Sequence, residues 1–308
     1  MSVVRATRAD LDDLRRLHQT ARYRFADFGH EDLPNLVRDS VSMVGRDGGN
    51  LWGFVSLQPE ERPSTLADDA PTRCYFRALS LRGGFAPTEH VRLLLQAALA
   101  QLDVSGGPML VIAYGGDSWI VGALRDAGFE LADHVQFYEL DHPHRQVNQQ
   151  VTTTSAAVLR PADSNDIGQL ADMDAAAFPP LWHFSQKDMF ELFLRSRMTV
   201  ATGGGGNTEA GIVGYTAAVA NSSDELQLAR LAVRPDLQRT GIGRQLLVDV
   251  VAYAAAERYE RILLNTQTDN ERSQGLYRSV GFRPVGLPVP VLTRLINETP
   301  HETQSPEP

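Results

Sequence analysis

Residue types that often carry stability or chemistry are scarce in this chain. Its 308 residues include one cysteine, Cys74, and one lysine, Lys187, the other basic residues being arginine. A single cysteine excludes an intrachain disulfide and a cysteine-rich zinc site, and we interpret Cys74 as a small half-buried side chain. We therefore expect no metal. The preference for arginine over lysine is typical of a GC-rich, bacterial genome.

Long apolar runs are also missing. None approaches the ~20 residues that a membrane-spanning helix needs, and residues 1–6 lack the apolar core of a signal peptide. The net charge of −9 argues against general nucleic-acid binding, which needs clustered basic residues. With 43% hydrophobic and 22% charged residues, we expect a globular cytoplasmic protein with room for two domains and with no membrane or nucleic-acid partner.

A glycine turn between an apolar strand and an apolar helix is the most informative feature present. Residues 226–233 alternate as a strand does and Pro235 ends them, whereas apolar residues after Gly243 recur at helical spacing. The first amides of such a helix lack intrahelical partners and lie at the positive end of the helix dipole. Because Gly241 and Gly243 carry no Cβ that would hold a ligand away, the pattern predicts a cradle for a pyrophosphate.

A second block indicates which phosphate ligand to expect. It runs from Asn270 through Ser273 and Tyr277 to Gly281 and Phe282. Together the two blocks resemble the GNAT superfamily of acetyl-CoA-dependent N-acetyltransferases, whose pattern is Gln/Arg-x-x-Gly-x-Gly/Ala followed about thirty residues later by Asn-x-x-Ala/Ser-x-x-x-Tyr-x-x-x-Gly-Phe. The resemblance covers residues 222–283, and on it the chain is identified as a member of that superfamily.

The resemblance and the residue pattern imply an α/β (α+β) fold, a mixed and mostly antiparallel sheet with helices on both faces. For the second half of the chain we expect strands at residues 198–202, 211–220, 226–234, 261–266 and 289–295. We expect helices from about residue 166 and over residues 186–195, 242–257 and 271–279. In the family, the cofactor binds where strands 226–234 and 261–266 would splay apart. The glycine run at 203–206 is interpreted as a hairpin turn.

The same signals occur twice, which predicts two tandem GNAT folds. Residues 4–14 correspond to 159–170, residues 51–55 to 212–216 and residues 124–129 to 277–282, at offsets of 155 to 156, 161 and 153. We expect a first domain over residues 1–141, a polar linker over 142–156, a second domain over 157–296 and a disordered tail over 297–308.

The first copy lacks the cofactor signals. Arg82, Gly83 and Gly84 follow its fourth strand without the Gln-x-x-Gly-x-Gly spacing, and Leu124 stands where the second copy has Tyr277. We predict a degenerate domain that binds acetyl-CoA poorly or not at all. In length the chain is similar to mycothiol synthase, a tandem member of the family with its activity in the C-terminal half.

The resemblance also implies how the second domain holds its cosubstrate, acetyl-CoA. The turn would wrap the pyrophosphate with its amides and its two arginine side chains, through Gln238, Arg239, Thr240, Gly241, Ile242, Gly243 and Arg244. The strand before it would pair its main chain with the pantetheine arm and aim its last N–H at the thioester oxygen, through Leu231, Ala232 and Val233. Asn270 and Ser273 would face the cofactor. An ordinary turn and a helix N-cap would use the same residues.

Three residues bear on catalysis. By resemblance, Tyr277 protonates the departing sulfur, and a phenol with a pKa near ~10 can do so at neutral pH; plain core packing is the alternative. Glu225 and Gln227 share one face of a strand, and Gln227 stands where several family members carry glutamate. Because glutamine cannot accept the proton, either Glu225 takes it directly or through water, another group does, or the amine enters neutral. A solvated turn residue is the alternative for Glu225.

The acceptor is the least specified part. In this family the first two helices and the loop between them select it, and here that loop offers Phe178, Trp182 and His183, although a hydrophobic turn would use the same residues. We expect acetyl-CoA to be attacked directly by a primary amine that belongs to a small molecule or a peptide. Cysteinyl amines, antibiotic amines, polyamines and protein N-termini are all open as acceptors. A non-catalytic acetyl-CoA sensor or interaction protein is the alternative. The chain is expected to be a monomer with an internal pseudo-dimer, or a homodimer.

Overall fold

The computed structural model describes residues 1–26, 33–62, 70–146, 157–203 and 211–297. The chain divides into two units, here called unit 1 (Met1–His134 with Val289–Pro308) and unit 2 (Val135–Pro288). Each unit has its own set of strands and helices and its own hydrophobic clusters. Among the described residues, no helix combines the length and the apolar character needed to cross a membrane.

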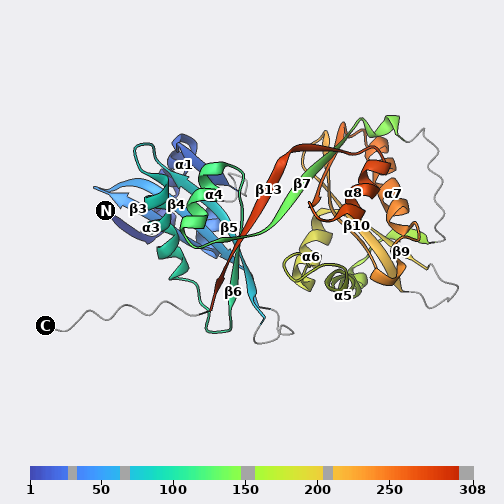
Figure 1. Ribbon diagram of the computed structural model, residues 1–308, viewed down its shortest axis with the longest axis horizontal. Helices are drawn as coiled ribbons and strands as arrows, with labels where there is room; N and C mark the ends of the chain where they lie inside the picture. The colour runs from blue at the N-terminus through green and yellow to red at the C-terminus, as the bar shows by residue number, and fades with distance from the viewer. Residues whose placement is uncertain (27–32, 63–69, 147–156, 204–210, 298–308) are drawn as a thin grey trace. The chain divides into compact units, whose positions relative to one another are not determined.

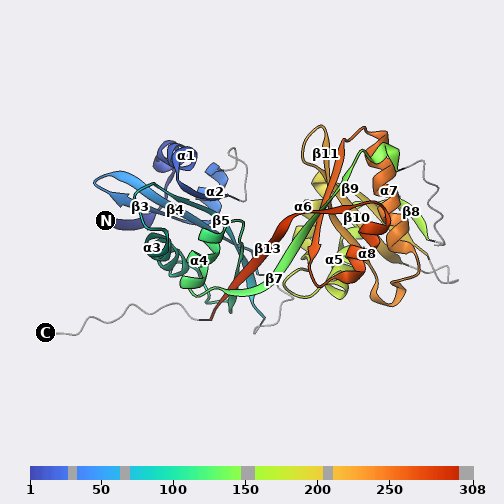
Figure 2. The same ribbon diagram turned by 45° about the horizontal axis from the view of Figure 1, so that its top comes forward.

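Unit 1 is a sheet with helices on both faces. Its strands are ordered β1 (Ser2–Arg5), β3 (Val41–Asp47), β4 (Asn50–Pro59), β5 (Thr72–Leu81), β6 (Met109–Tyr114) and the end of β13 (Arg283–Ile296). The β5–β6 pair is parallel, and the other pairs are antiparallel. Figure 2 shows α1 (Leu11–Thr20) and α2 (Leu33–Asp39) on one side and α3 (Pro87–Leu99) and α4 (Ser118–Asp126) on the other.

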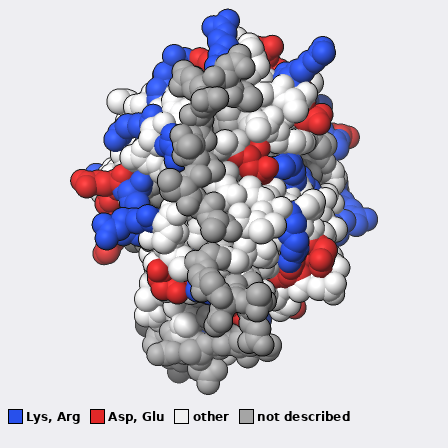
Figure 3. Space-filling model, turned by 90° about the vertical axis from the view of Figure 1, so that its right-hand side faces the viewer, with Lys and Arg blue, Asp and Glu red and all other residues white. Residues whose placement is uncertain are grey.

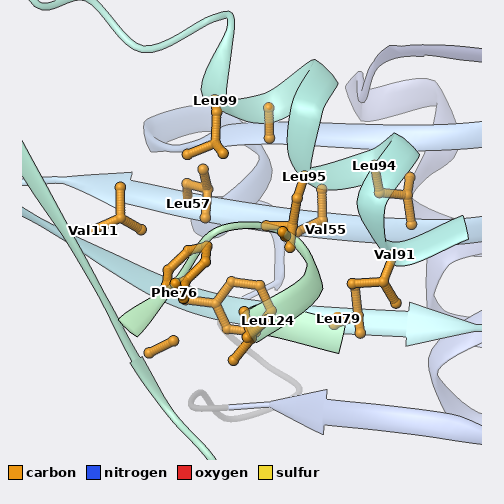
Figure 4. Close-up of a cluster of buried hydrophobic side chains, with 14 of the residues drawn as sticks. Val55, Leu57, Phe76, Leu79, Val91, Leu94, Leu95, Leu99, Val111 and Leu124 are labelled. Carbon is orange, nitrogen blue, oxygen red and sulfur yellow. The ribbon is translucent and has the colours of Figure 1, made fainter. Parts of the chain in front are cut away.

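Leu124 belongs to the larger core of unit 1. This core joins α3 and α4 to the sheet, and Figure 4 shows Leu124 among its aliphatic and aromatic side chains. Leu124 is fully buried, as are Leu79 and Leu95 of the same cluster. Cys74 is also fully buried there, deeper than the half-buried position expected, and burial raises the pKa of its thiol far above the ordinary range. A thiol held in its neutral form is a poor nucleophile, which supports the packing interpretation.

Unit 2 repeats this arrangement. Its strands are ordered as the end of β7 (Glu130–Asp141), β12 (Arg261–Gln267), β11 (Glu225–Val233), β10 (Ile212–Ala220), β9 (Arg197–Thr202) and β8 (Val158–Pro161). Its helices are α5 (Ile167–Ala177), α6 (Gln186–Arg195), α7 (Ile242–Ala256) and α8 (Glu271–Ser279) (Figure 1). One core joins α7 and α8 to β11 and β12, and another joins α5 and α6 to β9 and β10. The mixed, mostly antiparallel fold predicted from the sequence is confirmed. Figure 3 shows one face of the molecule, where arginine and acidic side chains are mixed.

The two sequence repeats exchange their last strands. Residues Val135 to Asp141 of β7 pair with β12 in unit 2, and residues Val291 to Ile296 of β13 pair with β6 in unit 1. The units therefore differ from the contiguous ranges 1–141 and 157–296, because similarity between repeats does not specify which sheet a terminal strand joins. β13 also begins earlier than the expected residue 289. Its first residues include prolines and Gly286, which has a φ of 67°, and these residue types do not indicate a strand in the sequence.

The proposed linker and tail fall largely outside the described residues. Of residues 142–156, the structure describes the first five, and a short 3-10 turn (Pro143–Arg145) among them packs against α7. Residues 147–156 lie outside the described part of the chain, as do 298–308 of the proposed tail. The glycine run at 203–206 begins the connection between the antiparallel strands β9 and β10, and residues 204–210 are again outside the description.

A β-bulge occurs at the same point in both repeats. The β4–β5 register shifts between Ser56 and Leu57, and the β10–β11 register shifts between Ala217 and Ala218, at an offset of 161 in the first strand of each pair. In unit 2 the bulge changes which residues face which helices, because Leu228 and Leu231 pack with the α7–α8 core whereas Ala229 and Ala232 pack with the α5–α6 core. The extra residue therefore turns Arg230 towards α5.

Candidate active site

A cleft opens in unit 2 where β11 and β12 separate. The two strands are paired in parallel only from Glu225 to Gln227 on β11 and from Arg261 to Leu263 on β12. Beyond that point the cleft has a volume of about 670 Å³. It is lined by the end of β11, the following turn and the starts of α7 and α8, with Ala177 and Phe178 from the end of α5: Leu231, Ala232, Val233, Gln238, Arg239, Gly241, Gly243, Arg244, Asp269, Asn270, Glu271, Arg272, Ser273 and Leu276.

The turn before α7 presents unpaired amides to this cleft. Gly241 is the N-cap of α7 with a φ of 91°, and it gives the helix no side-chain cap. The Gln245 amide donates to the carbonyl of the N-cap Gly241, so the amides of residues 242–244 have no partner within the helix. Arg239 has a φ of 66°, a conformation that a non-glycine residue adopts at some cost. Such a helix start binds anions.

The two glycines of the turn have different reasons to be there. The left-handed backbone at Gly241 strains any residue with a Cβ. At Gly243 an added Cβ would lie 3.4 Å from Leu276 and 3.5 Å from Val233, which are ordinary contacts. The structure therefore requires glycine more strongly at 241 than at 243.

Charged side chains of both signs line the cleft. Arg239 and Arg244 come from the turn, as the sequence predicted, and Arg244 Nη1 donates to Ser279 Oγ at 2.7 Å. Sequence reasoning missed Asp269, Glu271 and Arg272, which flank Asn270 at the start of α8. Because they are next to Asn270 in the motif, the sequence could have indicated that these three residues also lie near the cofactor.

Helix α8 carries Asn270 and Tyr277. Asn270 is its N-cap and accepts a hydrogen bond from the Ser273 amide at 3.1 Å, so the capping role exists alongside any ligand contact. Tyr277 is 6% exposed and is absent from the residues that line the cleft, unlike its neighbour Leu276. Burial raises the pKa of Tyr277 to about 12, against smaller lowering effects of the Ser273 side chain and the Arg230 charge. Its phenol is therefore protonated, and able to donate, throughout the physiological range.

A buried ion pair joins α5 to β11 and also binds the segment that follows α5. The Asp174 carboxylate is fully buried and accepts hydrogen bonds from Arg230 Nε at 2.7 Å, from Arg230 Nη2, from the Tyr215 hydroxyl and from the Phe184 amide at 2.7 Å. Burial raises the pKa of Tyr215 well above its usual value, so the hydroxyl remains a donor. Four donors converge on one carboxylate, which satisfies the charge where water is excluded.

Arg230 in turn holds the loop that was predicted to select the acceptor. Its guanidinium carbon lies 3.6 Å from the ring centroid of Phe178 and 4.2 Å from that of Phe184, and Nη2 donates to the Trp182 carbonyl at 2.7 Å. Phe178 lines the cleft, whereas Trp182 and His183 do not belong to the lining. No sequence signal indicated this arrangement, because Asp174 and Arg230 lie in different elements 56 residues apart.

Glu225, the candidate base, and its neighbour Gln227 both lie away from the cleft. Glu225 accepts from Asn221 Nδ2 at 3.0 Å, and its carboxylate lies 3.5 Å from Arg261 Nε. Neither Glu225 nor Gln227 lines the cleft. At ~3.3 Å per strand residue, Glu225 is about 20 Å along β11 from Leu231.

In unit 1 a strand of the chain itself occupies the equivalent position. Strand β2 (Tyr23–Ala26) pairs with the end of β5, from Ala78 to Leu81. Since β4 covers the other edge of β5 and β6 pairs only with residues 72–75, β2 fills the gap that in unit 2 is the cleft. The Tyr23 ring packs on Trp119 of α4 at 5.2 Å between centroids. This gap is therefore closed to an added ligand strand.

The corresponding segment of unit 2 is a turn. Pro179 and Pro180 follow α5, and the amides of Trp182 and His183 both donate to the Pro179 carbonyl. Proline has no N–H with which to extend a ladder, so this segment does not add to β11 as β2 adds to β5. Within the described ranges, no strand pairs with the edge of β11 beside the cleft.

Comparisons with known proteins agree with this geometry. Residues 167–282 match the acetyltransferase (GNAT) family model. The chain is 37% identical over 82 residues to the N-alpha-acetyltransferase RimI of Mycobacterium tuberculosis, which covers 27% of this chain and 50% of RimI. The matches span no more than half the length of the curated relatives.

Solved structures extend the likeness to the whole chain. A GCN5-related N-acetyltransferase from Sphaerobacter thermophilus has a TM-score of 0.64 at 12% identity, covering 96% of both chains. A tandem GNAT protein from the clavulanic acid biosynthesis pathway also has a TM-score of 0.64, at 14% identity, covering 96% of this chain and 98% of that one. These likenesses show the fold, and residues 167–282 form a domain that matches the acetyltransferase (GNAT) family.

Proposed function

We propose that unit 2 transfers an acetyl group from acetyl-CoA to a primary amine by direct attack. The observation that carries the proposal is the cleft at the diverging strands, with the uncapped start of α7 on one wall. The pyrophosphate would accept from the amides of residues 242–244, with Arg239 and Arg244 adding charge. The pantetheine arm would lie along the open edge of β11 at residues 231–233.

The chemistry needs one proton moved to sulfur and one removed from nitrogen. The amine nitrogen would attack the thioester carbonyl and form the C–N bond, the resulting oxyanion would be stabilised by a β11 main-chain amide such as that of Val233, and the C–S bond would break as the carbonyl re-forms. Tyr277 would donate its proton to the leaving thiolate, a role that its protonated state supports. The amine would attack in its neutral form, and the proton that its nitrogen loses after the attack would leave through water, since Glu225 is paired with Arg261 away from the cleft.

The acceptor remains a class rather than a compound. Phe178 gives the cleft an apolar wall, and Arg230 and Asp174 hold that wall in position. The relative RimI is by name an N-alpha-acetyltransferase, which makes peptide N-termini one member of the amine panel beside polyamines, antibiotic amines and cysteinyl amines.

We further propose that the chain has one acetyl-CoA site. In unit 1 the gap beside β5 holds β2, and Leu124 stands where unit 2 has Tyr277. Both observations support the prediction that the first repeat does not bind the cofactor.

Binding without catalysis is the second candidate. It is favoured by the absence of Glu225, Gln227 and Tyr277 from the residues that line the cleft. The enzyme is expected to release CoA when an amine from the panel is added, whereas a protein that only binds acetyl-CoA is not.

The test measures release of CoA thiol with each amine for the wild type and Tyr277→Phe. The matched control is Tyr253→Phe, which removes the same hydroxyl from a residue of α7 outside the cleft lining. Amine-dependent release that Tyr277→Phe lowers and Tyr253→Phe preserves supports the enzyme. Saturable acetyl-CoA binding without release for any amine supports the binding protein.

A further inference from the structure

The first repeat contributes a buried tyrosine to unit 2. Tyr138 lies on β7, the last strand of the first repeat, and is 1% exposed. Its ladder partner on β12 is Leu264, so the main-chain register fixes its position. The centroid of its ring lies 6.1 Å from that of Tyr277.

The Tyr138 hydroxyl is bonded to two side chains of α8. It donates to Gln274 Oε1 at 3.1 Å and accepts from Arg278 Nη2 at 3.1 Å. Arg278 Nη2 also lies 3.1 Å from Gln274 Oε1, which closes a three-membered network. Because Gln274 and Arg278 lie one helical turn apart and flank Tyr277 on α8, this network fixes the helix on the sheet.

Gln274 also binds the turn that leads into the cleft wall. Its Nε2 donates to the carbonyls of Gln267 at 3.1 Å and Thr268 at 2.8 Å. These carbonyls belong to the turn between β12 and α8, and the next two residues, Asp269 and Asn270, line the cleft. A chain of hydrogen bonds therefore joins Tyr138 to the turn that leads directly into the cleft wall at Asp269 and Asn270.

We propose that Tyr138 is a positioning residue for the proposed acetyl transfer, so that the first repeat supplies part of the second repeat's active site. Through Gln274 it orients α8 with Tyr277 and the turn at 267–270. The inference rests on the proposed function of unit 2. It also accounts for the presence of a first repeat whose own cofactor gap is filled by β2.

The test uses the full-length chain, because a fragment that starts at residue 157 would lack the strand that pairs with β12. Tyr138→Phe keeps the ring and removes only the hydroxyl, and Tyr253→Phe is again the control. We expect Tyr138→Phe to lower kcat about fivefold and acetyl-CoA affinity about threefold, the equivalent of roughly one hydrogen bond each, with KM for the amine unchanged. Gln274→Met should produce the same pattern, since it removes the next link.

A double-mutant cycle separates positioning from general stability. If Tyr138 acts through Tyr277, the loss of kcat in Tyr138→Phe/Tyr277→Phe will be smaller than the product of the single losses. Equal kcat and equal acetyl-CoA affinity for the wild type and Tyr138→Phe, or multiplicative losses in the cycle, would overturn the inference. A wild type that binds no acetyl-CoA would instead overturn the proposed function, so the two failures are distinguishable.

Discussion

The Arg230 guanidinium donates two hydrogen bonds to the fully buried carboxylate of Asp174, that from Nε at 2.7 Å, and this pair joins β11 to α5. Arg230 is itself only 10% exposed. Removing one charge would leave the other buried without its partner, which is far more costly than losing an exposed pair. The pair therefore connects stability to the shape of the cleft wall at Phe178.

Replacing Asp174 with Asn should destabilise the protein by about 3–5 kcal/mol, because Arg230 would lose its counter-charge inside the core. Asp172→Asn is the control, since Asp172 lies on the same helix and is exposed. Urea unfolding of both variants checks the prediction. Equal midpoints for the two variants would show that the ion pair does not hold the loop.

Tyr277→Phe should lower kcat by about a hundredfold and leave acetyl-CoA affinity nearly unchanged, because only the proton donor is removed. Initial rates and calorimetry on the same preparations measure the two quantities. A variant with the wild-type rate would remove Tyr277 from the mechanism.

The Tyr277 hydroxyl should also make stability depend on alkaline pH. Burial raises its pKa from 10.0 to about 12, so the folded state favours the protonated phenol more than the unfolded state does. This contribution is fully present below pH 10 and is lost as pH rises to 12. Between these values the wild type should lose more stability than Tyr277→Phe in denaturant titrations. Parallel losses in both proteins would contradict the buried position of the phenol.

Arg244→Gln should weaken acetyl-CoA binding about fivefold, because a cationic side chain would be lost from the phosphate end of the cleft. Arg92→Gln is the matched control, an exposed arginine on α3, the helix of unit 1 that corresponds to α7. Calorimetric titration compares them, and the Arg244 difference should shrink at high salt. Identical affinities for the two variants would place the phosphates elsewhere.

Local patterns predicted much of unit 2. The sequence predicted α6 over 186–195 and α8 over 271–279, and the structure confirms both bounds. In α6 the apolar spacing coincides with a capping box from Ser185 to Asp188, so every local signal agrees. The turn at 238–244 was likewise local, since strand, glycines and helix follow one another in the sequence.

Pairings between distant residues could not be predicted in this way. Tyr138 contacts Gln274 at a separation of 136 residues, and β2 adds to β5 across more than fifty residues. Nothing in the local pattern of residues 23–26 distinguishes a strand from the turn that residues 179–182 form, apart from the two prolines. Glu225 and Gln227 lie on β11, within the strand expected at 226–234 or directly before it, but the length of β11 separates them from the cleft.

Calorimetric titration of the full-length protein with acetyl-CoA tests the central claim most directly, because it reports the number of sites together with their affinity. The account predicts one site per chain, abolished by Gly241→Asp, which combines a side chain at a φ of 91° with a negative charge at the start of α7. Two sites would mean that β2 does not close unit 1, and the absence of binding would contradict the assignment of the cleft to acetyl-CoA.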